Sequence, residues 1–112
     1  MILNGKCKED FEKWYIEKYH SNTKNKVTLK LYLIVFWDLC DSKKYGILVD
    51  FFDSVGIRID LLSVGEPTMQ GFNFFGHRFL INGFKANLTF IKTRQEARTK
   101  AIEKANECYN ER

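Results

Sequence analysis

Two histidines are the side chains of this 112-residue chain most suited to general acid–base chemistry, because an imidazole changes its charge near neutral pH. His20 ends a stretch with an apolar stripe, and an imidazolium would favour the dipole of a helix end, so a surface position is expected. His77 lies in a run of alternating apolar residues and is predicted to point toward the hydrophobic face of a sheet. A general base needs a nucleophile within reach, and the sequence identifies none, so His77 is interpreted as a buried histidine hydrogen-bonded to the backbone. Catalysis would require a cleft that places His77 beside Asp50 or Asp53.

The carboxylates Asp50 and Asp53 are the one candidate for metal binding. They lie one helical turn apart, and two carboxylates at that spacing can hold a hard divalent cation if other oxygens join them. No D-x-D-x-D-G loop and no H-x-x-x-H pair accompanies them, so an exposed polar helix face is the preferred interpretation. The glycines form neither a P-loop nor a Rossmann fingerprint, which excludes nucleotide-dependent enzymology based on either motif. We therefore expect no cofactor and no metal, and we favour a non-enzymatic role.

Cysteine usage and hydropathy both favour the cytoplasm. Cys7, Cys40 and Cys108 lie far apart and include no C-x-x-C pair, which excludes a zinc ribbon and a thioredoxin-type redox site. Packed or idle thiols in a reducing compartment are expected. The first residues lack the charged and long apolar segments of a signal peptide. The longest apolar run, residues 31–37, is far shorter than the ~18 residues of a membrane span, so no membrane association is expected.

The clearest local signal is Asn82-Gly83, the preferred pair for a type I′ turn, between the alternating stretches 72–81 and 84–91. A two-residue loop fixes the register of such a hairpin and assigns every side chain to one of two faces. One face is apolar except for His77, and the other mixes apolar and polar groups. The predicted cross-strand pairs are Ile81 with Phe84, Phe79 with Ala86, His77 with Leu88, and Phe75 with Phe90.

The second face of this hairpin is the candidate binding surface, and it has two interpretations. Its apolar members are Phe72, Phe74, Leu80 and Ile91. Exposed, they would form a patch of the kind that contacts a protein partner or a second copy of the chain, and this is the favoured interpretation. The alternative is single-stranded nucleic acid, which proteins bind by stacking bases on aromatic rings and holding phosphates with cations. The cations of this alternative are Arg78, Lys85, Lys92, Arg94 and Arg98.

The elements that position these residues are predicted from periodicity. Apolar residues at three- and four-residue spacing predict helices over 8–20, from Asp41 to about Val55, and from the capping box 93–96 to about Tyr109. Residues 57–61 alternate and predict a strand, and 64–71, with two glycines and a proline, predict a loop. The stretch Val27–Trp37 alternates and is rich in β-branched and aromatic residues, which favours a strand. Its uniformly apolar second half fits a buried helix equally well.

Together these elements predict one domain, residues 1–112, of the α+β class. The expected architecture is a small, mostly antiparallel sheet of three to four strands with a β-hairpin, packed against N-terminal, middle and C-terminal helices. Hydrophobic residues at 45% and charged residues at 29% are ordinary globular values that exclude intrinsic disorder. Within the net charge of +4, the acidic middle of the chain is flanked by basic segments, which indicates a dipolar surface with two kinds of partner face.

Two segments, YGILVDFFDSVGI at 45–57 and TRQEAR…AIEKANECYN at 93–110, look like those of a known group. The chain resembles small uncharacterised proteins from phages and mobile elements of gut anaerobes. In that group a proline often precedes the first segment, and here Cys40 occupies about that place. The group has no established activity, so the resemblance implies no residue role. It favours an accessory protein, such as a regulator or inhibitor of a host system, that works by binding another macromolecule.

Overall fold

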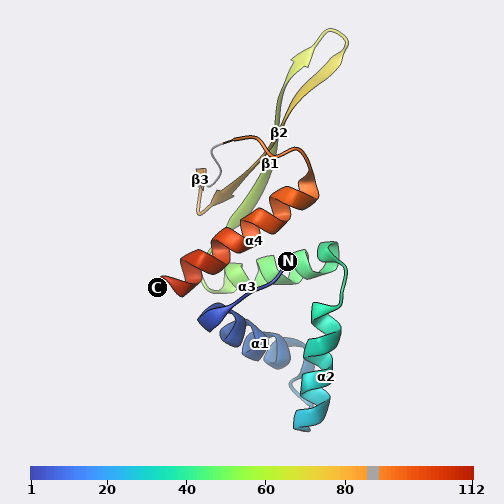
Figure 1. Ribbon diagram of the computed structural model, residues 1–112, viewed down its shortest axis with the longest axis vertical. Coiled ribbons are helices and arrows are strands. Elements are labelled where there is room, and N and C mark those ends of the chain that lie inside the picture. The colour runs from blue at the N-terminus through green and yellow to red at the C-terminus, as the bar shows by residue number, and fades with distance from the viewer. Residues whose placement is uncertain (86–88) are drawn as a thin grey trace.

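A computed structural model of the chain describes residues 1–85 and 89–112, which contain four helices and three strands. In chain order these are α1 (Gly5–His20), α2 (Lys26–Trp37), α3 (Asp41–Ser54), β1 (Ile59–Thr68), β2 (Gly71–Ile81), β3 (Phe84–Lys85) and α4 (Arg94–Asn110). The molecule is elongated, 60 × 29 × 18 Å, with the β1–β2 hairpin at one end of its long axis and α1 and α2 at the other (Figure 1). The predicted α+β class is confirmed.

An aromatic cluster around Phe11 joins α1, α2 and α3. The ring of Phe11 is fully buried, and its centroid lies 5.1 Å from that of Phe36 and 5.3 Å from that of Phe51. Three further rings contact it, those of Trp14, Tyr15 and Trp37. Aromatic side chains bury more apolar surface than any others, so this cluster fixes how the three helices meet.

The helix α4 packs across the inner half of the hairpin through its smallest side chains. Ala97, Ala101 and Ala105 are fully buried, and their methyl groups let the helix axis approach the sheet closely. The Thr93 half of the predicted capping box begins this helix, because the Thr93 hydroxyl accepts a hydrogen bond from the Glu96 N–H at 3.1 Å. Phe79 and Ile81 of β2 point into the same core.

The prediction of a strand over Val27–Trp37 is wrong, because this stretch forms α2. The Asn25 side chain accepts hydrogen bonds from the N–H groups of Val27 and Thr28, which starts a helix. Phe36 is fully buried against α1, whereas the opposite side of α2 is exposed. Local capping and the contact with α1 therefore outweigh the strand preference of the β-branched residues. Among the described residues, no helix is long and apolar enough to cross a membrane.

The sheet differs from its prediction because β1 continues through the segment 64–71, which was predicted as a loop. β1 and β2 pair antiparallel from Ile59–Ile81 out to Thr68–Gly71, with a bulge beside Val64 and Gly65. Pro67 is tolerated because β1 is an edge strand, where a missing N–H breaks no ladder. The third strand, β3, has only two residues. A sheet of three to four strands therefore overstates what forms, which is one long hairpin with a short third strand.

The predicted type I′ turn forms, but the predicted register holds only beside it. Asn82 and Gly83 both have positive φ, 53° and 85°, and Ile81 pairs with Phe84 as expected. Farther from the turn, His77 pairs with Ile91 instead of Leu88. The predicted partners Ala86 and Leu88 themselves lie outside the described residues. A shift of three residues is odd in number, so it moves Ile91 to the opposite face.

We expect Phe11→Ala to lower the free energy of unfolding by about 3–5 kcal/mol, because the cavity it leaves lies among five rings that cannot all move in. Urea unfolding followed by tryptophan fluorescence measures the change. Tyr19→Ala is the control, since Tyr19 is largely exposed on the same helix and its loss should have a small effect. Equal effects of the two substitutions would contradict the central place of Phe11.

Candidate functional site

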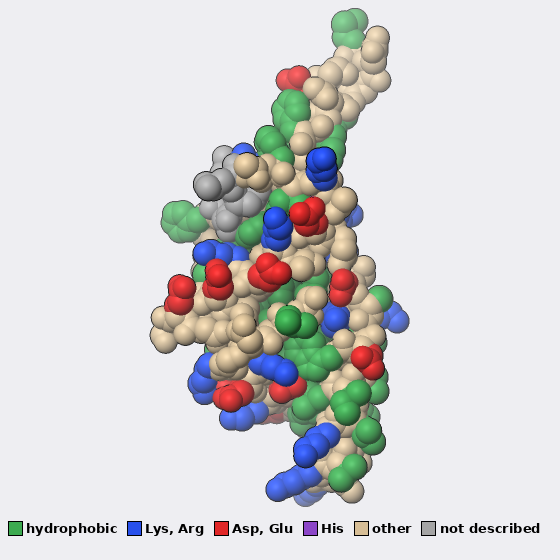
Figure 2. All heavy atoms as spheres, viewed as in Figure 1, with side chains coloured by type: hydrophobic (Ala, Val, Ile, Leu, Met, Phe, Trp, Pro, Cys, Tyr) green, Lys and Arg blue, Asp and Glu red, His purple; other side chains and the backbone are tan. Residues whose placement is uncertain are grey.

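The outer part of the β1–β2 hairpin exposes large apolar side chains far from the core. We call this part, residues 62–75, the arm. Its strands extend beyond α4 and have no layer of helix over them (Figure 1). Figure 2 shows hydrophobic side chains along this projection. The exposed members are Leu62, Met69, Phe72, Phe74 and Phe75. Phe72 and Phe74, paired with Pro67 and Gly65, share one face of the hairpin, whereas Leu62 lies on the other. Exposed apolar surface of this kind on a small protein is typical of an interaction site.

Glycines with no room for a side chain hold the aromatic rings of the arm in place. A Cβ at Gly65 would lie 2.7 Å from the ring of Phe72, so this ring lies directly over the glycine. Gly76 has φ of 147°, and a Cβ there would lie 2.5 Å from the Cβ of Phe90. The close approach of Phe90 brings its ring to 6.1 Å from that of Phe75. The backbone therefore positions these rings, and they do not lie loosely on the surface.

The structure brings together two of the four residues predicted for an apolar protein interface. Phe72 and Phe74 are exposed on the arm, at 59% and 46% of their surface. Leu80 is half-buried nearer the core. The predicted placement of Ile91 is wrong, because it is 5% exposed and pairs with His77 on the core face.

Three exposed residues of the arm were missed by the sequence prediction: Leu62, Met69 and Phe75. Leu62 and Met69 were missed because 64–71 was interpreted as a loop, which hid the extension of β1 and the hairpin tip. Phe75 was assigned to the apolar inner face, and the bulge between Gly76 and Phe74 turns it outward. One available signal was the alternating pattern at Ile59, Leu61 and Ser63. It predicts a strand that continues past Gly65, because an edge strand tolerates a proline such as Pro67.

The five cations of the nucleic-acid alternative do not converge on the aromatic rings of the arm. The Arg98 guanidinium donates to the Ser42 hydroxyl at 3.3 Å and stacks on the Tyr45 ring, so it joins α4 to α3. Arg78 stacks on the ring of Phe90, 4.4 Å from its centroid. Lys92 and Arg94 are exposed at the start of α4, and the Lys85 side chain lies outside the described part of the chain. Within the arm the sequence has no Lys or Arg, and its one charged residue is Glu66.

His77 is buried, as predicted, but its ring bonds to a side chain. Its Nδ1 lies 3.3 Å from the Ser63 hydroxyl on the neighbouring strand, a partner that the sequence did not reveal. A serine beside a histidine is the first half of a hydrolase site, and a third group must orient the base. No described carboxylate bonds to this imidazole, and Asp50 and Asp53 are exposed on α3. The arrangement that catalysis by His77 would require is therefore not formed.

Metal binding finds no further support in the geometry. Among residues 1–85 and 89–112, no group of three or more His, Cys, Asp and Glu side chains could hold a metal ion. Asp50 and Asp53 remain a neighbouring pair on an exposed helix face.

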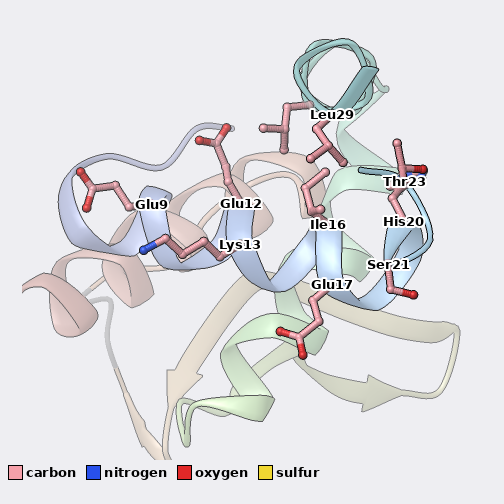
Figure 3. A pocket seen from close by; sticks show the side chains of 10 residues that line it. Glu9, Glu12, Lys13, Ile16, Glu17, His20, Ser21, Thr23 and Leu29 are labelled. Carbon is pink, nitrogen blue, oxygen red and sulfur yellow. The ribbon is translucent and has the colours of Figure 1, made fainter. Parts of the chain in front are cut away.

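A groove of about 600 Å³ runs between α1 and the start of α2 (Figure 3). Its apolar lining comes from Ile16 of α1 and from Leu29 and Leu33 of α2, while glutamates of α1 stand along its rim. His20 closes one end, where its ring stacks on that of Tyr32 at 3.8 Å. The surface position predicted for His20 fits this half-buried end of the groove.

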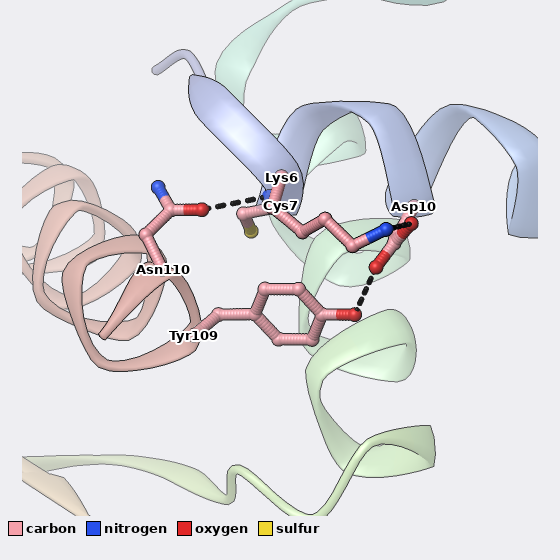
Figure 4. A network of polar contacts seen from close by, with 5 residues as sticks. All are labelled: Lys6, Cys7, Asp10, Tyr109 and Asn110. Atoms are coloured by element: carbon pink, nitrogen blue, oxygen red, sulfur yellow. Dashed lines mark hydrogen bonds and ion pairs between the residues drawn. The ribbon is translucent and has the colours of Figure 1, made fainter. Parts of the chain in front are cut away.

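A polar network ties the first turn of α1 to the last turn of α4 (Figure 4). The Asn110 side-chain oxygen accepts from the Cys7 N–H at 2.8 Å, and the Tyr109 hydroxyl donates to Asp10. This hydrogen bond lowers the pKa of Asp10 and raises that of Tyr109, and the neighbouring Lys6 ammonium lowers the pKa of Asp10 further. Burial raises the pKa of the Cys7 thiol to about 12, so this thiol stays protonated and inert. The network is a structural clamp.

No protein-family model, curated protein sequence or solved structure matches this chain. The resemblance to small proteins of phages and mobile elements stays a prediction, as does the cytoplasmic location.

We expect Tyr109→Phe to raise the pKa of Asp10 toward the value of about 3.9 found in unfolded chains, because the main hydrogen bond to the carboxylate is lost. A lowered folded-state pKa stabilises the fold above the unfolded value, and this contribution disappears as the pH falls through the folded value. The stability difference between wild type and variant should therefore be constant near neutral pH and shrink below about pH 4. Carboxyl NMR titration and urea unfolding measure the two quantities, and Tyr19→Phe is the control.

We expect thiol-labelling reagents to distinguish the three cysteines of the native protein. Cys40 is exposed and should react first, whereas Cys7 is fully buried with a raised pKa and should react only on unfolding. Mass spectrometry of peptides after timed alkylation at about pH 8 gives the order. Fast labelling of Cys7 in folded protein would contradict the clamp between α1 and α4.

Proposed function

We propose that this protein is a protein-binding domain whose contact surface is the arm. One observation carries the proposal: five large apolar side chains, at least 45% exposed, lie on a two-stranded projection that no described helix covers. An isolated two-stranded hairpin is marginally stable in water and is normally covered on one face. A partner on the face of Phe72 and Phe74 would bury these two rings and supply that cover.

The charge of the arm supports a protein partner over nucleic acid. Binding of nucleic acids depends on cations beside the aromatic rings, because phosphate contacts supply much of the affinity. The arm has only Glu66 as a charged residue, Arg98 joins α4 to α3, and Arg78 lies at the base of the arm with its guanidinium stacked on Phe90. An apolar surface with almost no charge is the pattern found at the centre of protein interfaces.

The face of the arm supports this contact better than the outer edge of β1 does. Strand addition needs a free row of N–H and C=O groups, and the outer edge of β1 has Pro67, which lacks an N–H, next to Glu66. Proline and charged residues on an edge strand are ordinary protection against pairing with another strand. We infer that the partner contacts the rings of Phe72 and Phe74.

A partner is first captured with a photo-crosslinking amino acid in place of Met69, the fully exposed residue at the tip, in a lysate of the source cells. The captured protein is then purified, and its affinity is measured by isothermal titration calorimetry. We expect Phe72→Ser to weaken this binding at least about tenfold, because a buried aromatic anchor is lost. Thermal unfolding checks that the variant remains folded.

Phe84→Ser is the matched control, since Phe84 is an equally large, exposed ring that lies outside the arm. Equal affinities of the two variants would refute the proposed surface. The nucleic-acid alternative is tested separately by fluorescence anisotropy with labelled oligonucleotides at two salt concentrations. The binding surface would be the start of α4, and not the arm, if the oligonucleotides bind tightly with a steep salt dependence and Arg94→Ala weakens this binding while Phe72→Ser does not.

A further inference from the structure

The helix α2 is apolar on two opposite sides, and the fold covers only one of them. Phe36 faces the core, with Leu29 and Leu33 beside it along the groove with α1. On the far side, four apolar side chains are each at least 55% exposed, and we call them the α2 ridge: Val27, Leu31, Ile34 and Val35. A helix that is apolar all round is normally buried all round. In the described chain, nothing buries the α2 ridge.

The spacing of the α2 ridge matches the seam of a helix pair. Val27, Leu31 and Ile34 follow one another at intervals of four and three residues, the repeat that keeps one stripe facing a partner helix. The helix stands at the end of the molecule opposite to the arm (Figure 1), so a second helix can lie along it without meeting the sheet.

The charges around α2 oppose its own dipole. Lys24 and Lys26 lie at its N-terminal end, where the dipole is positive, and Asp38 caps its C-terminal end, where the dipole is negative. No acidic residue occurs from 21 to 37. The side chains of these three residues are exposed and take part in no hydrogen bond or ion pair within the described chain. In Figure 2, blue side chains gather at the lower end of the molecule, next to several green ones.

We propose that α2 pairs antiparallel with α2 of a second copy of this chain, about a two-fold axis near Leu31. In that register Leu31 of one copy contacts Leu31 of the other. Val27 and Lys24 of each copy lie beside Val35 and Asp38 of the other. The lysines then lie beside the negative end of the second helix, so charges that destabilise a lone α2 stabilise the pair. A parallel pair would bring lysine to lysine and aspartate to aspartate.

The self-complementary arrangement of this one helix favours a second copy over an unrelated partner. A two-fold interface uses the same patch on both subunits, and here the apolar side chains have opposite charges at the two ends of the helix, with the exposed Lys30 next to Leu31. The helix is only 12 residues, about 18 Å, long, so the interface lies at the small end of the range for specific complexes. We therefore expect a dimer with a dissociation constant in the micromolar range.

Sedimentation equilibrium of the full chain from about 1 to about 500 µM tests the proposal. Wild type should shift from the monomer mass of 13.2 kDa toward twice that value. Leu31→Glu should remain monomeric throughout, because two carboxylates would meet on the axis. Leu31 is exposed in the monomer, so the circular dichroism spectrum of this variant should match that of wild type. Phe84→Ser is the control and should dimerise like wild type.

Charge reversal tests the register. Lys24→Glu and Asp38→Lys should each weaken self-association at least tenfold, and neither should lower the melting temperature of the monomer, because each improves the match with the helix dipole. An equimolar mixture of the two variants should associate again, since both contacts between the copies then join opposite charges. A monomeric wild type, or single variants that associate as well as wild type, would overturn the antiparallel dimer. The α2 ridge would be assigned to a membrane surface instead if the wild type is monomeric and binds anionic phospholipid vesicles, while Leu31→Glu does not bind them.

Discussion

The close approach of α4 to the sheet is the constraint on which the rest of the structure depends. Three alanines lie on the buried side of this helix, beside Ile102 and Asn106, and their small methyl groups let it approach the inner half of the hairpin. α4 also contacts α1 and α3, so it is the element that joins the sheet to the helical end of the molecule. Because the core is concentrated around α4 and Phe11, the two extremities of the chain, the arm and α2, have little of the core beneath them. Both extremities consequently expose apolar surface.

Sequence reasoning located the elements that carry their own local signals. The capping box at Thr93, the stripe of alanines after it, and the Asn82-Gly83 turn each fix a conformation through neighbouring atoms, and all three form. α2 was missed because its β-branched residues alternate, while the deciding cap at Asn25 is one side chain in a polar turn. The outer half of β1 was missed because Gly65 and Pro67 are typical of loops. Only the pairing with β2 makes them part of a strand, and that pairing is not visible in the local sequence.

The exposure of Phe72 and Phe74 was predicted, but not the face on which they lie. The bulge at Phe75 turns both rings to the face of His77, and they are exposed because this part of the hairpin extends beyond α4. Ile91 was placed by counting from the turn, and its pairing with His77 differs from that count by three residues. One unpaired residue in a strand reverses the face of everything beyond it. The burial of His77 was predicted from the same hairpin. This prediction is confirmed because β2 is regular from His77 through Phe79 to the turn. Its bond to Ser63 needed the partner strand that the sequence hid.

The asparagine clamp between the ends of α1 and α4 determines when the protein can finish folding. The N–H groups of Asn4 and Cys7 donate hydrogen bonds to the side-chain oxygens of Asn106 and Asn110, more than a hundred residues later in the chain, and the Asn110 amide donates back to the Asn4 side chain. During synthesis on a ribosome, α1 emerges first and remains without these caps until the last turn of α4 has left the exit tunnel. Closing so long a loop is entropically unfavourable and slow, so the capping of α1 waits for α4. Folding therefore has to join α1 to α4 and does not proceed element by element as the chain appears.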